Sequence, residues 1–101
     1  MIPVVGPVIQ QPSQAHPAVD IACMPNSAVR AMANGMGTFH WDHDMGWVFT
    51  QGDTTISHLA HRGVDRFYTI GEVISACGST GRLSHGPHVH VEGPPAVLQR
   101  F

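Results

Sequence analysis

The chain has 101 residues, of which 43% are hydrophobic and 12% are charged. This length suits one domain with one modest core. Five basic side chains against seven acidic ones give a formal net charge of −2, which argues against the basic surface of a nucleic-acid-binding protein. The apolar segment at residues 1–9 contains two prolines and no basic residue, so it predicts neither a signal peptide nor a membrane span.

The chain consists of short strand-like runs, and no long stretch keeps the 3.6-residue apolar period of a helix. Turn-forming clusters such as Pro25–Ser27 and Gly78–Gly81 separate these runs. Residues 46–58 resemble a hairpin whose second arm carries His58, and Ser57–Gly63 is the one candidate for a short helix. We therefore expect an all-β, antiparallel domain of two packed sheets, a sandwich or barrel-like fold over residues 1–101. Its strands are expected at Val19–Cys23, Ala28–Met32, Gly46–Gln51, Thr54–His58, Val73–Cys77 and His88–Glu92.

The two cysteines, Cys23 and Cys77, are too few for a disulfide framework, and neither belongs to a CxxC pair. Each of them lies in an apolar, strand-like context. We therefore predict that both are small buried core residues, in preference to metal ligands or a disulfide.

Eight histidines are many for so short a chain, and some of them have the spacing of a metal site. His88 and His90 lie two apart in a strand-like run, so their side chains face the same way, with Glu92 next on that face. Upstream, His16 and Asp20 supply a second imidazole and a carboxylate. A catalytic zinc site takes three protein ligands and leaves a fourth position for water. The predicted ligands of one Zn²⁺ per chain are His16, Asp20 and His90.

Two further histidines, His58 and His88, are predicted to handle protons and the developing oxyanion, because imidazole suits both tasks near neutral pH. Zinc lowers the pKa of its bound water towards about 7 and polarises the scissile carbonyl. This water would attack the carbonyl with the two histidines assisting. No HExxH motif occurs, so the base is not a helix-borne glutamate.

Taken in order, these motifs resemble the lysostaphin-type (LytM-like) zinc endopeptidases, which cut the peptides of peptidoglycan. The family's HxGxD stretch is similar to His16–Asp20, and its DIAAPxGTPV pattern is similar to Asp20–Val29 without a gap. Its YAHL is similar to Ile56–Leu59, and its long pattern that ends in GPHLHFE is similar to Gly71–Glu92. The resemblance runs over residues 14–93 and so covers most of the chain.

The resemblance implies zinc ligands at His16, Asp20 and His90, the same residues that the spacing suggests. It implies His88 as the general base or acid, and His58 as its partner in stabilising the tetrahedral intermediate. It also implies a mostly antiparallel β fold with the metal site in a loop-walled groove. The implied substrate is the peptide part of bacterial peptidoglycan.

Several residues outside this set have weaker predictions. Asn26 replaces the family's usual turn glycine, and asparagine enters the left-handed region more readily than most residues. Glu92 is expected to support the ligands, because the set of three is already filled. His40 and Trp41, in a stretch that resembles a loop, are a hypothesis for substrate binding, because aromatic side chains near a cleft often grip ligands. An exposed or groove-wall role is expected for His43, His61 and His85.

Two other functions are weighed against the peptidase. Some relatives in the resembled family have lost their metal ligands and only activate other wall hydrolases, but this chain keeps every ligand and both catalytic histidines. Metal-dependent oxygenases of the double-stranded β-helix type also use HxH on a strand. Their glutamate usually lies farther along the chain than Glu92, and they do not need an HxxxD upstream.

The setting is predicted from what the chain lacks. Without a signal peptide or a wall-binding module, it is expected to be a phage or prophage lysin that is released or carried to the bacterial cell wall. An excised catalytic domain of a larger exported protein is the alternative. Neither nucleic acid nor membrane insertion is expected, and the sequence points to no particular peptide bond, bacterial target or oligomeric state.

Overall fold

The computed structural model describes residues 2–13 and 17–101. Within these residues the chain forms nine strands and one short helix. In chain order these elements are β1 (Val8–Gln10), β2 (Ala18–Ala22), β3 (Ala28–Arg30), β4 (Gly35–Asp42), β5 (Gly46–Gln51), β6 (Thr54–Leu59), β7 (Arg66–Tyr68), β8 (Val73–Ala76), β9 (His88–Glu92) and α1 (Pro95–Leu98).

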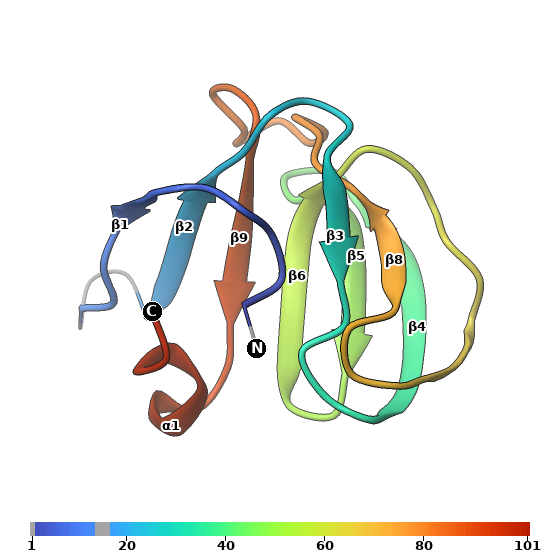
Figure 1. Ribbon diagram of the computed structural model, residues 1–101. Helices are drawn as coiled ribbons and strands as arrows, with labels where there is room; N and C mark the ends of the chain where they lie inside the picture. Colours follow the sequence, from blue (N-terminus) through green and yellow to red (C-terminus); the bar gives the residue numbers. More distant parts are fainter. Residues whose placement is uncertain (1, 14–16) are drawn as a thin grey trace.

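The strands form two antiparallel sheets (Figure 1). Seven strands form the larger sheet in the order β1-β2-β9-β6-β5-β4-β7, and β3 pairs with β8 in the smaller one. Strand β9, which is late in the sequence, therefore lies between β2 and β6. The expected all-β, two-sheet architecture is confirmed.

Period-two alternation decides which face of β2 and β9 is buried. Val19 and Ile21 of β2 are fully buried, as are Val89 and Val91 of β9. The residues between them are only partly buried and lie on the opposite face of the sheet. One face of these two strands thus joins the core, and the other is left for polar side chains.

The core fills the space between the two sheets. Val29 of β3 and Ile74 of β8 belong to the same buried cluster as the aromatic residues of the larger sheet. The ring of Phe49 packs against Phe39 with centroids 5.1 Å apart and against Tyr68 at 5.5 Å. These tilted and edge-on contacts are the geometries that aromatic rings favour.

Three of the strands were not predicted. Strands β1 and β7 have three residues each, too few for a clear alternation. Strand β4 is eight residues long and includes the stretch that was interpreted as a loop. A Cβ at its Gly37 would lie 2.3 Å from the Phe49 ring, so this glycine makes room for core packing.

The region after Ser57 does not form the expected helix. Strand β6 continues to Leu59, and the segment beyond it is irregular up to β7. The only helix of the described residues is α1. The predicted hairpin is confirmed, since Gln51 pairs with Thr54 across a two-residue turn. Asn26 has the left-handed backbone expected of it, with φ 66°.

The prediction for the two cysteines is wrong, because Cys23 and Cys77 form a disulfide. Cys77 is buried as expected, but its sulfur bonds to a cysteine 54 positions away. Cys23 directly follows β2 and Cys77 directly follows β8, so the bond ties the larger sheet to the smaller one. Backbone hydrogen bonds support the same junction, since Asn26 donates to the Cys77 carbonyl and Cys77 donates to Ser27.

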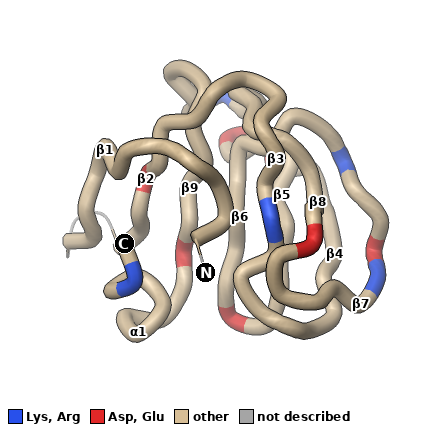
Figure 2. Tube along the Cα trace, in the orientation of Figure 1, with Lys and Arg blue, Asp and Glu red and all other residues tan. Residues whose placement is uncertain are grey.

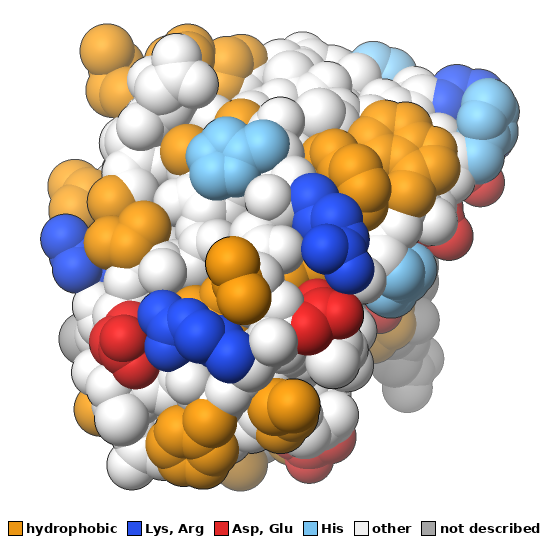
Figure 3. All heavy atoms as spheres, turned by 90° about the vertical axis from the view of Figure 1, so that its right-hand side faces the viewer, with side chains coloured by type: hydrophobic (Ala, Val, Ile, Leu, Met, Phe, Trp, Pro, Cys, Tyr) orange, Lys and Arg blue, Asp and Glu red, His pale blue; other side chains and the backbone are white. Residues whose placement is uncertain are grey.

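The surface has few charges. The chain has no lysine, and Figure 2 shows the arginine positions spread along the described chain without a cluster. On the face shown in Figure 3, apolar side chains are separated by polar and charged ones. A helix long and apolar enough to cross a membrane does not occur in the described part of the chain.

Removing the disulfide is expected to lower stability markedly. A crosslink that closes a loop of this length restricts the unfolded chain and is worth about 4 kcal/mol in the loop-entropy model. We expect reductant to lower the melting temperature of the wild type, and to leave that of a Cys23→Ala/Cys77→Ala double variant unchanged. Thermal unfolding with and without reductant measures this, and equal effects on both proteins would contradict it.

Candidate active site

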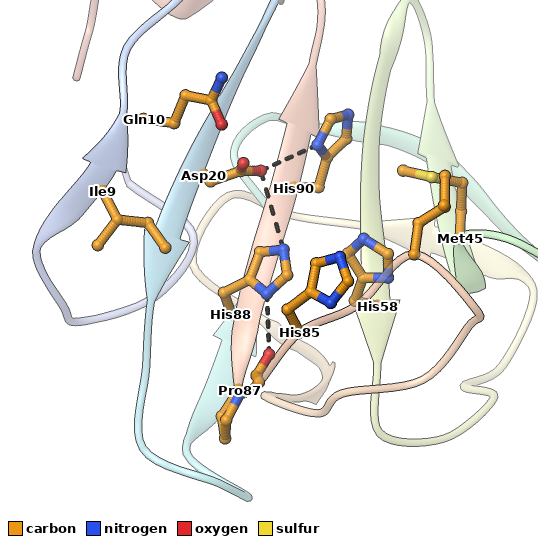
Figure 4. A pocket seen from close by; sticks show the side chains of 11 residues that line it. Ile9, Gln10, Asp20, Met45, His58, His85, Pro87, His88 and His90 are labelled. Carbon is orange, nitrogen blue, oxygen red and sulfur yellow. Dashed lines mark hydrogen bonds and ion pairs between the residues drawn. The ribbon is translucent and has the colours of Figure 1, made fainter.

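The predicted catalytic residues meet in one cavity of about 530 Å³ (Figure 4). It opens on the face of the larger sheet where β1, β2, β9 and β6 lie side by side. Apolar side chains of Ile9, Met45 and Leu83 form part of its lining. Its polar lining residues are Gln10, Asp20, His58, His85, His88 and His90.

The pairing of β2 with β9 brings Asp20 to His90. The two residues are directly opposite in the antiparallel register, and Asp20 Oδ1 lies 2.9 Å from His90 Nδ1. The other ring nitrogen of His90, Nε2, lies 3.0 Å from the Glu92 carboxylate. Both side chains of the pair are largely shielded from solvent, whereas that of Glu92 is 55% exposed. His90 is therefore held between two carboxylates.

His88 lies on the same face of β9, opposite Ala22. The small alanine leaves space above β2, and His88 Nε2 comes within 3.9 Å of Asp20 Oδ1. Its Nδ1 lies 2.8 Å from the Gly86 carbonyl oxygen, which can only accept a hydrogen bond. Nδ1 of His88 therefore carries a hydrogen, and Nε2 is the nitrogen that faces Asp20.

His58 reaches the cavity because β6 contains a β-bulge. Phe49 pairs with Ile56 and Trp47 pairs with Leu59, so two residues of β6 oppose the single Val48 of β5. The backbone of His58 is left-handed, with φ 64°. Strict alternation would put Ile56 and Leu59 on opposite faces, but both are buried in the core, and the bulge turns His58 to the cavity (Figure 4).

Two backbone contacts hold His58 in this unusual conformation. Its N–H donates to the Met45 carbonyl at 2.8 Å, and its Nδ1 donates to the Thr80 carbonyl at 2.7 Å. The imidazole lies close to that of His88, with ring centroids 4.8 Å apart. Burial is the largest cause that lowers the pKa of His58 below its ordinary value, and the nearby His88 and His90 act in the same direction. His58 is therefore held neutral near pH 7.

The donor set suits a divalent metal that prefers nitrogen and oxygen ligands. An imidazole nitrogen of His90 and a carboxylate oxygen of Asp20 point at each other from adjacent strands. The third predicted ligand, His16, lies outside the described residues. Within the described residues, no group of three His, Cys, Asp or Glu side chains is arranged to hold a metal ion.

The suggested substrate-binding residues lie elsewhere. His40 and Trp41 are exposed on β4 and do not line the cavity, and the ring of Trp41 packs edge-on against Trp47 at 5.3 Å. Their role in binding stays a prediction. His43 and His61 are also exposed, in agreement with the expectation.

Other lining residues were missed or only partly anticipated. His85 lines the cavity beside His88, which agrees with a groove-wall role. Ile9 and Gln10 come from the unpredicted strand β1, and Met45 comes from the hairpin between β4 and β5. No motif marks these three residues, since only the folded sheet brings them to the histidines.

Several solved structures with a similar fold are described as peptidases. The chain is similar to a Pseudomonas aeruginosa protein described as a peptidase M23, with 26% identity and a TM-score of 0.77 over 90% of this chain and 42% of that one. A zinc-containing peptidase from Vibrio cholerae has 21% identity and a TM-score of 0.73 over 89% and 34%. The catalytic domain of the antimicrobial peptidase lysostaphin from Staphylococcus simulans has 25% identity and a TM-score of 0.66, over 85% of this chain and 72% of that one.

The chain therefore has the fold of the M23 peptidases, and this likeness supports a peptidase. It spans less than half the length of the first two proteins. No protein-family model and no curated protein matches the sequence.

Lowering the pH is expected to destabilise the folded protein through His58. Because its pKa is lowered from 6.5, the folded protein binds this proton less well than the unfolded chain does. The contribution of neutral His58 to the free energy of unfolding is fully present above pH 6.5. It is lost as the pH falls from 6.5 through the lowered pKa of His58. Urea unfolding at a series of pH values measures it.

The matched control for this titration is His58→Asn, since asparagine has no titrating group and tolerates a left-handed backbone. The free energy of unfolding of the wild type should fall more steeply below pH 6.5 than that of the variant. Identical pH dependence in the two proteins would show that His58 keeps its ordinary pKa.

Proposed function

We propose that the chain is a zinc-dependent endopeptidase that hydrolyses peptide cross-links of bacterial peptidoglycan. The observation that carries this proposal is the meeting of Asp20 and His90, 2.9 Å apart, with His58 and His88 in one open cavity. The M23 fold and the motifs of the sequence support the same reaction class. The catalytic domain is proposed to occupy residues 1–101 and to bind one zinc ion.

The proposed zinc ligands are Asp20, His90 and His16. Imidazole and carboxylate are the ligands that catalytic zinc takes in hydrolases, and Glu92 would fix the orientation of the His90 ring through Nε2. When bound, zinc supplies a Lewis acid and lowers the pKa of a bound water. The similar Vibrio cholerae peptidase is described as zinc-containing, which supports this choice of metal.

The two histidines would handle protons. Each donates its Nδ1 hydrogen to a backbone carbonyl, of Thr80 for His58 and of Gly86 for His88, so each neutral ring keeps a lone pair on Nε2. An Nε2 lone pair can accept a proton from water, and the resulting N–H can donate to an oxyanion or a leaving amine. His88, closer to Asp20, suits the base, and His58 suits the stabilisation of the oxyanion.

The setting outside the cytoplasm has independent support. Disulfides persist in oxidising surroundings and are rare among reduced cytosolic proteins. The Cys23–Cys77 bond therefore suits a protein that acts at the bacterial cell wall, either as a released phage lysin or as the catalytic domain of an exported protein. Lysostaphin, to which the chain is similar, is described as an antimicrobial peptidase.

The alternative is a wall-binding protein that activates another hydrolase without cutting peptides itself. Such a protein would have no need for two histidines whose Nδ1 hydrogens are fixed and whose Nε2 atoms share a cavity with Asp20. The hydrolase is therefore the better supported of the two.

The first test is the loss of turbidity of purified peptidoglycan. We expect the zinc-loaded wild type to clear the suspension and to release new amino groups, with no new reducing ends. Removal of metal by a chelator and the His88→Ala substitution should each reduce the rate at least about 100-fold, the scale of general acid–base catalysis. Readdition of zinc should restore only the chelated wild type.

Two outcomes would overturn the proposal in different ways. Stoichiometric zinc without cleavage of any wall preparation would favour the activator. Absence of bound zinc at micromolar concentrations would remove the ligand assignment, and the mechanism with it.

A second prediction concerns Glu92. Because its carboxylate accepts a hydrogen bond from the ring of His90, Glu92→Gln is expected to weaken zinc affinity about 10- to 100-fold. Competition with a zinc-sensitive dye measures the dissociation constant. Glu72→Gln, which removes an exposed carboxylate that contacts Thr69 and Arg66, is the matched control and should leave zinc affinity unchanged.

A further inference from the structure

The loop Gly78–Gly81 carries a motif that the proposed reaction does not use. We propose that Thr80 in this loop is a positioning residue that sets the tautomer and direction of the His58 ring. Its consequence for catalysis rests on the proposed function, whereas its effect on the ring does not. Thr80 lines no part of the cavity and acts only through His58.

The hydroxyl of Thr80 joins the two strands beside the bulge. Thr80 Oγ1 donates to the Leu59 carbonyl at 2.6 Å and accepts the N–H of Trp47 at 3.2 Å. Leu59 and Trp47 are the paired residues that close the bulge on the side next to His58. A single side chain thus anchors the loop to β5 and β6 at the point where β6 turns its histidine outward.

The backbone of the same residue contacts the catalytic ring. The Thr80 carbonyl accepts the Nδ1 hydrogen of His58 at 2.7 Å. A carbonyl cannot donate, so this contact selects the tautomer with a lone pair on Nε2. Because the carbonyl and the hydroxyl belong to one residue, the position of the hydroxyl also fixes the position of the carbonyl.

The backbone around this loop is packed so closely that three positions have room only for glycine. A Cβ at Gly46 would lie 2.1 Å from Thr80 Oγ1, and one at Gly81 would lie 2.3 Å from the Gly46 nitrogen. A Cβ at Gly78 would lie 2.6 Å from the backbone nitrogen of Ala60. The loop packs directly against the backbone of the hairpin and of β6, so a small change at Thr80 is passed to His58.

Valine at position 80 has nearly the shape of threonine but cannot keep this position. A methyl group in place of the hydroxyl would lie 2.6 Å from the Leu59 oxygen, whereas carbon and oxygen normally stay about 3.3 Å or more apart. The side chain would have to move by roughly 0.7 Å. The Thr80 carbonyl would move with it, away from the His58 ring.

The experiment compares Thr80→Val with Thr80→Ser, which keeps the hydroxyl, and with Ser79→Ala. Ser79 lies in the same loop, but its hydroxyl bonds to that of the partly buried Ser84 and not to β5, β6 or His58, so its loss is the matched control for the His58 ring. We expect peptidoglycan hydrolysis by Thr80→Val to fall about 10- to 100-fold, the scale of a misplacement below 1 Å. Thr80→Ser should restore most of the rate, and Ser79→Ala should keep it.

A second measurement follows the ring itself. ¹⁵N spectra of the histidine side chains should show His58 as the Nδ1–H tautomer in the wild type, Thr80→Ser and Ser79→Ala. In Thr80→Val we expect a mixture of tautomers and faster exchange of the Nδ1 hydrogen. If Thr80→Val does not fold, Thr80→Ala takes its place, since it lacks the hydroxyl without bringing a methyl group towards the Leu59 oxygen.

The outcomes separate this proposal from the proposed function. An unchanged His58 tautomer in a folded Thr80→Val overturns the positioning role, whatever the activity. A changed tautomer in a protein whose wild type cuts no peptidoglycan supports the positioning role and removes the proposed function. Equal loss of activity in Thr80→Ser and Thr80→Val would show that the hydroxyl is not what matters.

Discussion

Strand β9 is hydrogen-bonded to β2 on one side and to β6 on the other, and this double pairing decides where Asp20, His88 and His90 lie. Its valines are fully buried and its histidines face the cavity. A slip of one residue would turn Val89 and Val91 to solvent, at a cost of about 1.5–3 kcal/mol for each. The hydrophobic core thus enforces the register that brings His90 to Asp20, so the energy of folding also assembles the candidate metal site.

The parts of this arrangement that depend on local pattern could be predicted. Alternation alone indicates that His88 and His90 share a face, and the turn residues between Gln51 and Thr54 predict the hairpin. The all-β class follows from the same short, turn-bounded runs. Two of the three predicted ligands, Asp20 and His90, lie within the described residues and next to each other, whereas His16 lies outside them, and the role of the set as zinc ligands remains a prediction.

The parts that depend on distant contacts could not be predicted. Alternation in β6 would send His58 into the core, and its actual direction requires contacts to Met45 and Thr80 from other segments. The bond between Cys23 and Cys77 spans 54 positions, and nothing in either local context distinguishes a disulfide from two buried thiols. Strand β4 was missed because the stretch with His40 and Trp41 was interpreted as a loop, and the space that Gly37 leaves for the Phe49 ring appears only in the folded sheet.

The two halves of the cavity are built by separate means, and this has a consequence for how such proteins can diverge. Asp20 and His90 lie on strands that pair in an unbroken register, whereas His58 depends on a bulge and a loop. The side chain of Asp20 is not part of the apolar core cluster, and its contacts are with His90 and His88, not with the bulge of β6. In the proposed function, replacing Asp20 alone would remove one of the three zinc ligands, so a single codon change would be enough to turn a hydrolase on this scaffold into a protein that only binds its substrate.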